Sequence, residues 1–401
     1  MNGKRKEEMI ETLESSTKTC GRTKRLGGLR VTLISIVVTL AACGGGSSGS
    51  SGSVPSVSSA LPVGAVTVSG KQFMRDGQPW VPKGLVSVAF NAAPSVRQGL
   101  FLTAYNDFSP TELEAMKTWG ADTVRFMIAQ PALDPQAPLY DPTFISHVQT
   151  GVTEARAAGL NVIVTVQDES GTGETNPMTL PNAGTGRVWQ QLAPMFAGDP
   201  GIMFEIMNEP QPLPSVANWQ AWATAMNAMV AIIRNSGAKN VLLADGLGFA
   251  EYLSGAPTLA DPLNQVAYAD HPYPHSAADQ TTTGWDAKFG AFAAVTNAPV
   301  IVTEWSDENE PNGVFAYCDS NTPQAALSFL NYVQSRNIGL IGLGYDLPNQ
   351  PAVPRDGRIM LDFNGTPSTF ANGASCDVAD FGPGTVVQSF FRTGNVPGQL
   401  E

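Results

Sequence analysis

A regular alternation of short apolar segments with longer amphipathic ones constrains the fold of this 401-residue chain more than any other feature. Eight segments have the length and apolar character of buried strands: 81–88, 122–128, 161–167, 201–208, 241–245, 265–271, 299–304 and 339–345. Helical periodicity separates most of them, at 110–119, 143–158, 186–197, 215–236, 284–296 and 323–336. Strict alternation of strand and helix predicts a parallel sheet covered by helices.

Eight is also the number of strands that closes a (β/α)8 barrel. The alternative, an open doubly wound sheet, carries a glycine-rich phosphate loop after its first strand, and residues 86–90 read Val-Ser-Val-Ala-Phe instead. We therefore predict an α/β fold, a (β/α)8 TIM barrel, preceded by a β-hairpin over 66–80. Two connections are less regular, because 248–262 has a weak helical pattern and 384–392 alone offers a final helix.

The N-terminal region has the composition of a secretory signal. A basic stretch of 30 residues is followed by the apolar segment 31–40 and by small residues, and 44–52 is almost pure Gly and Ser, which is typical of a flexible linker. Leu40-Ala41-Ala42-Cys43 resembles the lipobox of bacterial lipoproteins, which implies that Cys43 is lipidated. We expect a lipoprotein signal peptide over 1–42, a linker over 43–63 and one folded domain over 64–401.

The lipobox resemblance implies a lipid-anchored protein of the bacterial cell envelope, on the periplasmic or cell-surface face of the outer membrane. The net charge is −12, and removal of the basic leader would make the protein more acidic. Such a surface repels nucleic acid and anionic lipid, so we expect membrane attachment through the lipid alone and a neutral partner. Cys318 and Cys376 lie in loop-like sequence and form a candidate disulfide outside the cytoplasm, with two buried thiols as the alternative.

The residues at the predicted strand ends limit the chemistry, because barrel enzymes place reacting groups there. These ends are rich in carboxylates and amides, the chain has three His, and no motif for acyl or phosphoryl transfer is present. Two cooperating carboxylates are therefore the expected chemistry. Glu205 and Glu209 share a strand face but lie ~13 Å apart along an extended strand, so Glu205 is expected to be structural. The candidate partners of Glu209 from spacing alone are Asp168, Asp245, Asp270, Glu304 and Asp346.

Four segments resemble glycoside hydrolase family 5, and the resemblance extends over 64–395. They are Ile202-Met-Phe-Glu-Ile-Met-Asn-Glu-Pro210 on the fourth strand, Pro299-Val-Ile-Val-Thr-Glu-Trp305 on the seventh, His271-Pro-Tyr273 after the sixth, and Arg125 on the second. The resemblance implies that Glu209 is the acid/base and Glu304 the nucleophile of a retaining mechanism, with carboxyl groups ~5–5.5 Å apart.

The same resemblance implies roles for neighbouring residues. Arg125 and Tyr273 would donate hydrogen bonds to Glu304 and lower its pKa, while the charge of Glu304 would raise the pKa of Glu209. Asn208 would bind the sugar 2-hydroxyl and His271 would orient the acid/base. Neutralisation of Glu205 by Arg125 inside the barrel is the competing interpretation. Metal ligation by His271 and His275 is the alternative for the histidines, and the rigid prolines at 272 and 274 and the scarcity of other His disfavour it.

Two departures from the family concern the sugar-holding residues. Gln167 stands where family members usually have a His, and Tyr345 stands where they usually have a Trp. Aromatic rings near the barrel rim, among them Tyr345 and Trp305, are candidates for stacking on sugar rings.

The sequence thus predicts a monomeric glycoside hydrolase that needs no metal or organic cofactor. Its expected reaction is hydrolysis of internal β-1,4 bonds in a neutral polysaccharide, with cellulose-type β-glucan as the leading substrate. Mannan, xylan and exo-acting β-glucosidase activity are alternatives within the family. A non-catalytic carbohydrate-binding lipoprotein is the alternative from another functional class.

Overall fold

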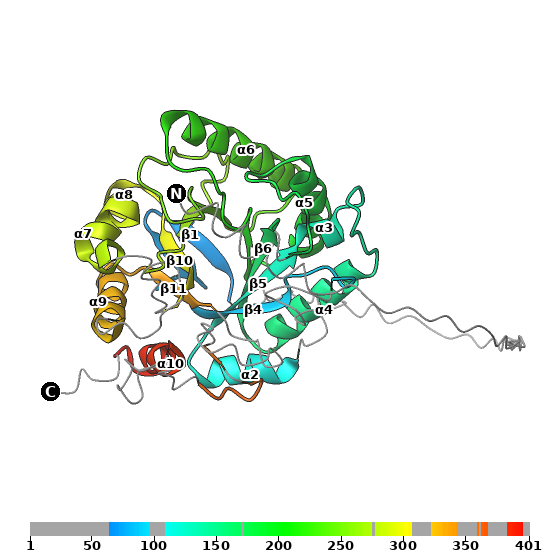
Figure 1. Cartoon of the computed structure of the whole chain (residues 1–401). Helices are drawn as coiled ribbons and strands as arrows, with labels where there is room; N and C mark the ends of the chain where they lie inside the picture. The colour runs from blue at the N-terminus through cyan, green and yellow to red at the C-terminus, as the bar shows by residue number, and fades with distance from the viewer. Residues whose placement is uncertain are drawn as a thin grey trace, which may run out of the picture. The chain divides into compact units, whose positions relative to one another are not determined.

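A computed structural model describes residues 64–96, 109–169, 172–274, 277–306, 322–343, 359–360, 362–367 and 383–395. Its centre is a closed barrel of parallel strands in the order β10-β11-β4-β5-β6-β7-β8-β9 (Figure 1). The strands are β4 Lys83–Phe90, β5 Thr123–Ala129, β6 Asn161–Gln167, β7 Ile202–Glu205, β8 Leu242–Asp245, β9 Val266–Asp270, β10 Val300–Trp305 and β11 Gly339–Gly342. The predicted TIM barrel is confirmed.

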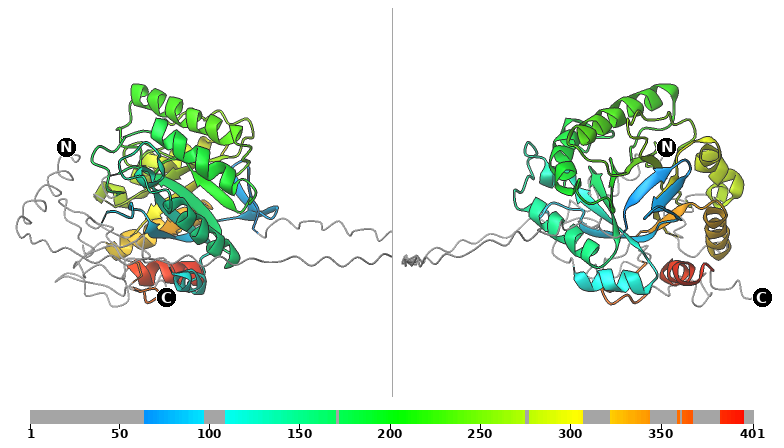
Figure 2. Two further views of the ribbon diagram at one scale, coloured as in Figure 1. Left: turned by 90° about the vertical axis from the view of Figure 1, so that its right-hand side faces the viewer. Right: turned by 180° about the vertical axis from the view of Figure 1, so that it is seen from behind.

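Helices form a ring around the barrel, as the two additional views show (Figure 2). The longer ones are α2 Pro110–Thr118, α4 Phe144–Ala157, α5 Ala183–Phe196, α6 Val216–Asn235, α9 Thr322–Ser335 and α10 Pro383–Thr393. Capping side chains define where several begin, because Ser109, Asn182 and Ser215 accept hydrogen bonds from the first-turn amides of α2, α5 and α6. Their apolar faces pack on the strands and so fix the strand ends in space.

The predicted helix over 284–296 is three consecutive pieces. These are α7 Thr282–Trp285, a π-helical segment Asp286–Gly290 and α8 Ala291–Val295. A 3-10 turn, Ala277–Gln280, precedes them, and a short helix, α3 Gln130–Leu133, follows β5. The connection 248–262 contains no helix, in keeping with its weak pattern.

The N-terminal strands cover one end of the barrel. The expected hairpin has a third strand, so that β1 Val66–Ser69, β2 Gln72–Arg75 and β3 Gln78–Trp80 form a small antiparallel sheet. Val66 and Phe73 from this sheet join the apolar cluster inside the barrel. The sheet lies at the N-terminal ends of the barrel strands, since Asn161 at the start of β6 donates a hydrogen bond to the Gly64 carbonyl (2.6 Å). The small sheet therefore lies opposite the carboxyl ends of the barrel strands.

Strand residues alternate between two apolar cores. The smaller core fills the barrel and includes Ile163, Leu243 and Ile301, while the larger core lies between strands and helices and includes Val164 and Tyr268. Among the described residues, no helix combines the length and apolarity needed to cross a bilayer. Cys43, Cys318, Cys376 and Tyr345 lie outside the described residues.

Candidate active site

Irregular backbone places the two glutamates of the expected catalytic pair. Glu209 follows the end of β7 and has a φ of +49°, a left-handed conformation that is uncommon for a non-glycine residue. Its amide donates a hydrogen bond to Asp245 Oδ2 at the end of β8 (3.0 Å). Glu304 lies in β10, where the pairing with β11 changes register between Val302 and Trp305. Such irregularities re-aim side chains near active sites.

These two departures from regular strand geometry bring the carboxyl groups together. Carboxylate oxygens of Glu209 and Glu304 and a ring nitrogen of His271 all lie within 4.8 Å of one another. The glutamates are 8% and 6% exposed, so both are largely shielded from water but reachable from the barrel mouth. His271 Nδ1 lies 3.1 Å from Glu209 Oε1 and 4.0 Å from Glu304 Oε2.

Arg125 connects Glu304 to the barrel interior. Its Nη1 donates to Glu304 Oε2 (3.0 Å), its Nε to Glu205 Oε2 (2.5 Å) and its Nη2 to Asn208 Oδ1 (2.6 Å). The two interpretations of Arg125 from sequence are therefore both realised, because one guanidinium neutralises Glu205 and also contacts Glu304. The Tyr273 hydroxyl donates to the other Glu304 oxygen (2.9 Å).

The pKa of Glu304 differs from the expectation. Burial raises it above its usual value, and the nearby Glu209 carboxyl adds to the rise, while His271, Arg125 and Tyr273 act in the opposite direction. The prediction that Glu304 has a lowered pKa is therefore wrong. Loss of hydration outweighs the donors that the sequence identified.

Asn208 has partners on both sides of its amide. Oδ1 accepts from Arg125, and Nδ2 donates to Glu169 Oε1 (2.7 Å). Glu169 lies just after β6 and has no role in the sequence-based scheme. The sequence could have indicated this residue, because Glu169 is an acidic residue close to the predicted strand end at Gln167. Gln167 itself is buried, and its Oε1 has no hydrogen-bond partner among the described residues.

His271 contacts Glu209 through one ring nitrogen and Thr303 of β10 through the other. Its Nε2 lies 3.0 Å from Thr303 Oγ1, and burial lowers the pKa of the ring to about 4. A neutral imidazole carries one ring proton, so the Nδ1 contact with Glu209 responds to whether Glu209 is protonated. Thr303 was not identified from the sequence.

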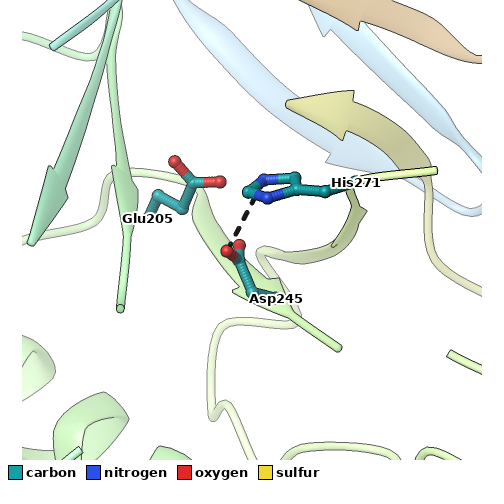
Figure 3. A group of neighbouring side chains, drawn as sticks. All are labelled: Glu205, Asp245 and His271. Atoms are coloured by element: carbon teal, nitrogen blue, oxygen red, sulfur yellow. Dashed lines mark ion pairs between the residues drawn. The ribbon is translucent and has the colours of Figure 1, made fainter. Parts of the chain in front are cut away.

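Beneath Glu209 lies a second group of side chains from neighbouring strands. Glu205, Asp245 and His271 point toward one another, with 3.7 Å between His271 Nε2 and Asp245 Oδ2 (Figure 3). All three are fully buried. Burial raises the pKa of Asp245, as does the neighbouring Glu205, whereas the pull of Arg125 overcomes burial and lowers the pKa of Glu205.

Two triads within the described residues have donor atoms close enough to hold a metal ion. They are Glu205, Asp245 and His271, and Glu209, His271 and Glu304. In each of them an Arg125 guanidinium nitrogen already contacts one carboxylate.

Among the described residues, Asp168 and Asp270 do not belong to the group formed by Glu209, His271 and Glu304. Asp168 accepts hydrogen bonds from Gln130 Nε2 (2.7 Å) and from the Met178 amide (3.2 Å), and burial raises its pKa to about 6. Asp270 is fully buried on the outward face of β9. Asp346 lies outside the described residues.

Trp305 is not placed to stack on a sugar. It is 2% exposed and stacks on Phe329 of α9, with ring centroids 5.0 Å apart, in the core between strands and helices. The prediction that Trp305 binds substrate is therefore wrong. Ile301 lies inside the barrel and Val302 outside it, so regular alternation would point Trp305 inward. The register change between Val302 and Trp305 reverses this and turns Trp305 outward.

Comparison with known proteins assigns the chain to a family. Residues 92–347 match the profile "Cellulase (glycosyl hydrolase family 5)", so the chain belongs to glycoside hydrolase family 5 and is a glycoside hydrolase. A manganese dependent endoglucanase, Eg5A of Phanerodontia chrysosporium, is 36% identical over 76 residues. That match covers only 19% of either chain.

Solved structures share the fold at low sequence identity. The Thermobifida fusca endoglucanase Cel5A catalytic domain has a TM-score of 0.57 and 18% identity, covering 82% of this chain and 98% of that one. The Saccharophagus degradans β-glucanase SdGluc5_26A in complex with cellotetraose has a TM-score of 0.57 and 20% identity, covering 76% and 90%. An endocellulase from Pyrococcus horikoshii has a TM-score of 0.59 and 14% identity, covering 77% and 97%.

Proposed function

We propose that this hydrolase cleaves internal β-1,4 bonds of a neutral β-glucan with retention of anomeric configuration. The observation that carries the proposal is the approach of Glu209 and Glu304 oxygens to within 4.8 Å of each other. Retaining enzymes hold their two carboxyl groups ~5–5.5 Å apart, whereas inverting enzymes need ~6.5–9.5 Å to admit a water molecule. The separation favours double displacement.

In this mechanism Glu304 is the nucleophile. It attacks the anomeric carbon as the glycosidic bond breaks, and Glu209 gives its proton to the departing oxygen. Glu209 then removes a proton from water, whose oxygen displaces Glu304 from the sugar. The hydrogen bonds from Arg125 and Tyr273 hold the attacking carboxylate in place, since each Glu304 oxygen has one of these donors.

His271 contacts the acid/base through Nδ1. When Glu209 is protonated, its O–H donates to the unprotonated Nδ1, and the Nε2 proton points to Thr303. The depressed pKa of His271 keeps the ring neutral, so it does not compete with the sugar oxygen for the acid's proton.

A β-glucan is the substrate that the comparisons favour. The structural relatives are named as an endoglucanase, a β-glucanase bound to cellotetraose and an endocellulase. The acidic surface of this chain disfavours a polyanionic polymer. Mannan and xylan are neutral and remain in the test as competing substrates.

The test combines three polymers with paired variants. Purified protein is incubated with β-glucan, mannan and xylan, and solution viscosity and the anomer first released, by NMR, are followed. We expect a rapid viscosity fall on β-glucan and a β-anomeric product. Glu209→Gln and Glu304→Gln should each lose at least ~10³-fold in kcat, in the range that removal of essential catalytic groups produces.

The control for these variants is Glu114→Gln. Glu114 is exposed on α2, where it pairs with Lys117, and its substitution should leave activity unchanged. An α-anomeric first product would overturn the retaining mechanism. Release of monosaccharide without viscosity loss would assign exo action instead.

We also propose that Cys43 is acylated and anchors the enzyme in the cell envelope. The support is the lipobox-like sequence before it. Labelled palmitate should enter the wild-type chain in a bacterial host and not the Cys43→Ser variant, which should leave the membrane fraction. Equal labelling of both would refute the anchor.

We further propose a disulfide between Cys318 and Cys376 in a monomeric enzyme. Non-reducing peptide mass spectrometry of secreted protein should give one peptide pair linked through these cysteines. Two free thiols would exclude the bond. Size-exclusion chromatography with light scattering should report the mass of a single chain.

A further inference from the structure

The acid/base Glu209 is supported from below by a buried pair of carboxyl groups. Glu205 ends β7 and Asp245 ends β8, two neighbouring strands of the barrel, and both are fully buried. Asp245 Oδ2 accepts the hydrogen bond from the Glu209 amide (3.0 Å). Asp245 itself is fixed by β8–β9 pairing and by Trp222, whose indole N–H donates to the Asp245 carbonyl (2.9 Å).

One oxygen of each carboxyl is already committed. Glu205 Oε2 accepts from Arg125 Nε (2.5 Å) and from the Thr165 hydroxyl, and Asp245 Oδ2 accepts from Glu209. The remaining oxygens, Glu205 Oε1 and Asp245 Oδ1, have no other hydrogen-bond partner in the described part of the chain. Two buried carboxylates with unpaired oxygens are costly unless a proton or a cation lies between them.

The surrounding charges favour a proton over a metal ion. The groups that face the pair are Arg125 from β5, His271 after β9 and the backbone amide of Glu209. The Arg125 guanidinium already supplies the positive charge that Glu205 requires. His271 Nε2, the nitrogen that faces Asp245 (3.7 Å), also contacts Thr303 Oγ1 (3.0 Å).

We propose that Glu205 and Asp245 share one proton, that Asp245 carries it, and that Asp245 is a positioning residue for Glu209. This inference rests on the proposed role of Glu209 as acid/base. The proton lies on Asp245 Oδ1 and is donated to Glu205 Oε1, while Glu205 keeps the negative charge that pairs with Arg125. The opposite pKa shifts of the two groups, raised for Asp245 and lowered for Glu205, agree with this division.

The arrangement gives Asp245 two functions. It holds the left-handed backbone of Glu209, a conformation that costs ~1–3 kcal/mol and persists only when neighbours enforce it. It also adds no negative charge beneath the active site, so Arg125 remains available to Glu304. A charged Asp245 would compete for that guanidinium.

The test compares an amide with a truncation. In Asp245→Asn, Nδ2 donates to Glu205 Oε1 and Oδ1 accepts from the Glu209 amide, so kcat should stay within ~3-fold of wild type. Asp245→Ala removes both contacts, and kcat should fall ~100-fold with KM nearly unchanged, because small misplacement of a catalytic group has effects of that size. Glu205→Gln removes the charged partner of Arg125 and should be more impaired than Asp245→Asn.

Infrared spectroscopy supplies a readout that a purely structural role would not move. At neutral pH the carbonyl stretch of one protonated carboxyl should disappear in Asp245→Asn, and it should weaken in Glu205→Gln, because that variant removes the carboxylate that raises the pKa of Asp245. Asp270→Asn serves as the control for a second buried carboxyl. Thermal unfolding verifies that each variant is folded, and the spectra report the proton even where activity is lost.

Three results would overturn the proposal: no carboxyl band lost in Asp245→Asn, equal kcat losses in folded Asp245→Asn and Asp245→Ala, or stoichiometric Mn²⁺ binding that Asp245→Asn abolishes. Mn²⁺ is a suitable probe because it accepts carboxylate and imidazole ligands. Failure of the proposed function is distinguishable, since it appears as activity in Glu209→Gln or Glu304→Gln and leaves the infrared result intact.

Discussion

Asp245 and Asp270 are the last residues of two adjacent strands, and both are fully buried with a raised pKa. Asp245 faces the barrel interior, as Leu243 does, and contacts the Glu209 amide and Glu205. Asp270 faces the helices, as Tyr268 does. Neither carboxylate oxygen of Asp270 has a hydrogen-bond partner among the described residues.

The difference shows that burial and residue type do not define a functional carboxyl. Strand pairing aligns Asp245 with Ala269, the residue before Asp270. A shift of one residue along the strands therefore separates Asp245, which contacts Glu209, from Asp270, which lies in the core between strands and helices. Burial raises the pKa of Asp270, nearby Lys288 opposes the rise and Glu251 adds to it. We expect substitutions on the inward face to affect catalysis and those on the outward face to affect stability alone.

The largest effect is expected for Arg125→Met, on the inward face. It leaves Glu205 buried without its cation and removes a donor from Glu304 and Asn208. Loss of one member of a buried ion pair costs ~3–5 kcal/mol, and activity should be abolished. Urea unfolding and kcat measure the two effects. The control is Arg187→Met, because the Arg187 side chain in its ion pair with Asp134 is 29% exposed, and equal losses in the two variants would contradict this view.

Lys288→Met is the corresponding test outside the barrel, because Lys288 lies in the π-helical segment Asp286–Gly290 and is near Asp270. Lys288 pairs with Glu251 (2.8 Å) and Asp279 (2.7 Å), and these carboxylates raise its pKa against the effect of burial. Because both partners are partly exposed, we expect a loss of ~2–3 kcal/mol, below the fully buried case. The value of kcat should not change. A tenfold fall in kcat in the folded variant would show that the faces are not separable.

Periodicity was sufficient to predict most of the fold. The helix expected at 215–236 is observed as Val216–Asn235, and the eight strands lie where apolar segments predict them. The exceptions have backbone causes. The strand expected at 201–208 ends at Glu205, and the helix expected at 284–296 contains the π-helical segment Asp286–Gly290. The residue pattern predicts neither the early end of β7 nor the π-helical segment.

The site was less accessible from sequence. Family resemblance supplied Glu209, Glu304, Arg125 and His271, but it could not give the contacts of Asp245, which depend on a left-handed Glu209 with no glycine to signal it. The pKa of Glu304 depends on how deeply the group is buried, which spacing does not report. The placement of Trp305 was equally hidden, because regular alternation from Ile301 would point it inward and the register change in β10 turns it outward.

Asp270→Asn should stabilise the protein in a pH-dependent manner. The unfolded pKa of Asp is ~3.9 and the folded pKa is raised, so the stability contribution of this group is complete below about pH 4 and is lost as pH rises through the folded pKa. Asn does not titrate. The advantage of the variant should therefore grow by ~1.4 kcal/mol per pH unit above that point until the folded pKa is reached.

Urea unfolding of wild type and Asp270→Asn between pH 4 and 8 measures this difference. Asp270→Leu is the companion variant, because it removes both the charge and the unpaired polar atoms. Both should retain wild-type kcat. A constant stability difference across the pH range would mean that Asp270 finds a partner when it ionises.

The smallest expected effects come from removing one hydroxyl on each face. Thr303→Val takes a partner from His271 Nε2 (3.0 Å), and Tyr268→Phe takes the acceptor of the Leu259 amide (3.1 Å). Each should cost ~1 kcal/mol in urea unfolding, as for a typical buried hydrogen bond. Only Thr303→Val should change the pH dependence of kcat, because it alters which nitrogen of the neutral ring carries the proton beside Glu209. A matching change in Tyr268→Phe would show that catalysis also depends on the outward face.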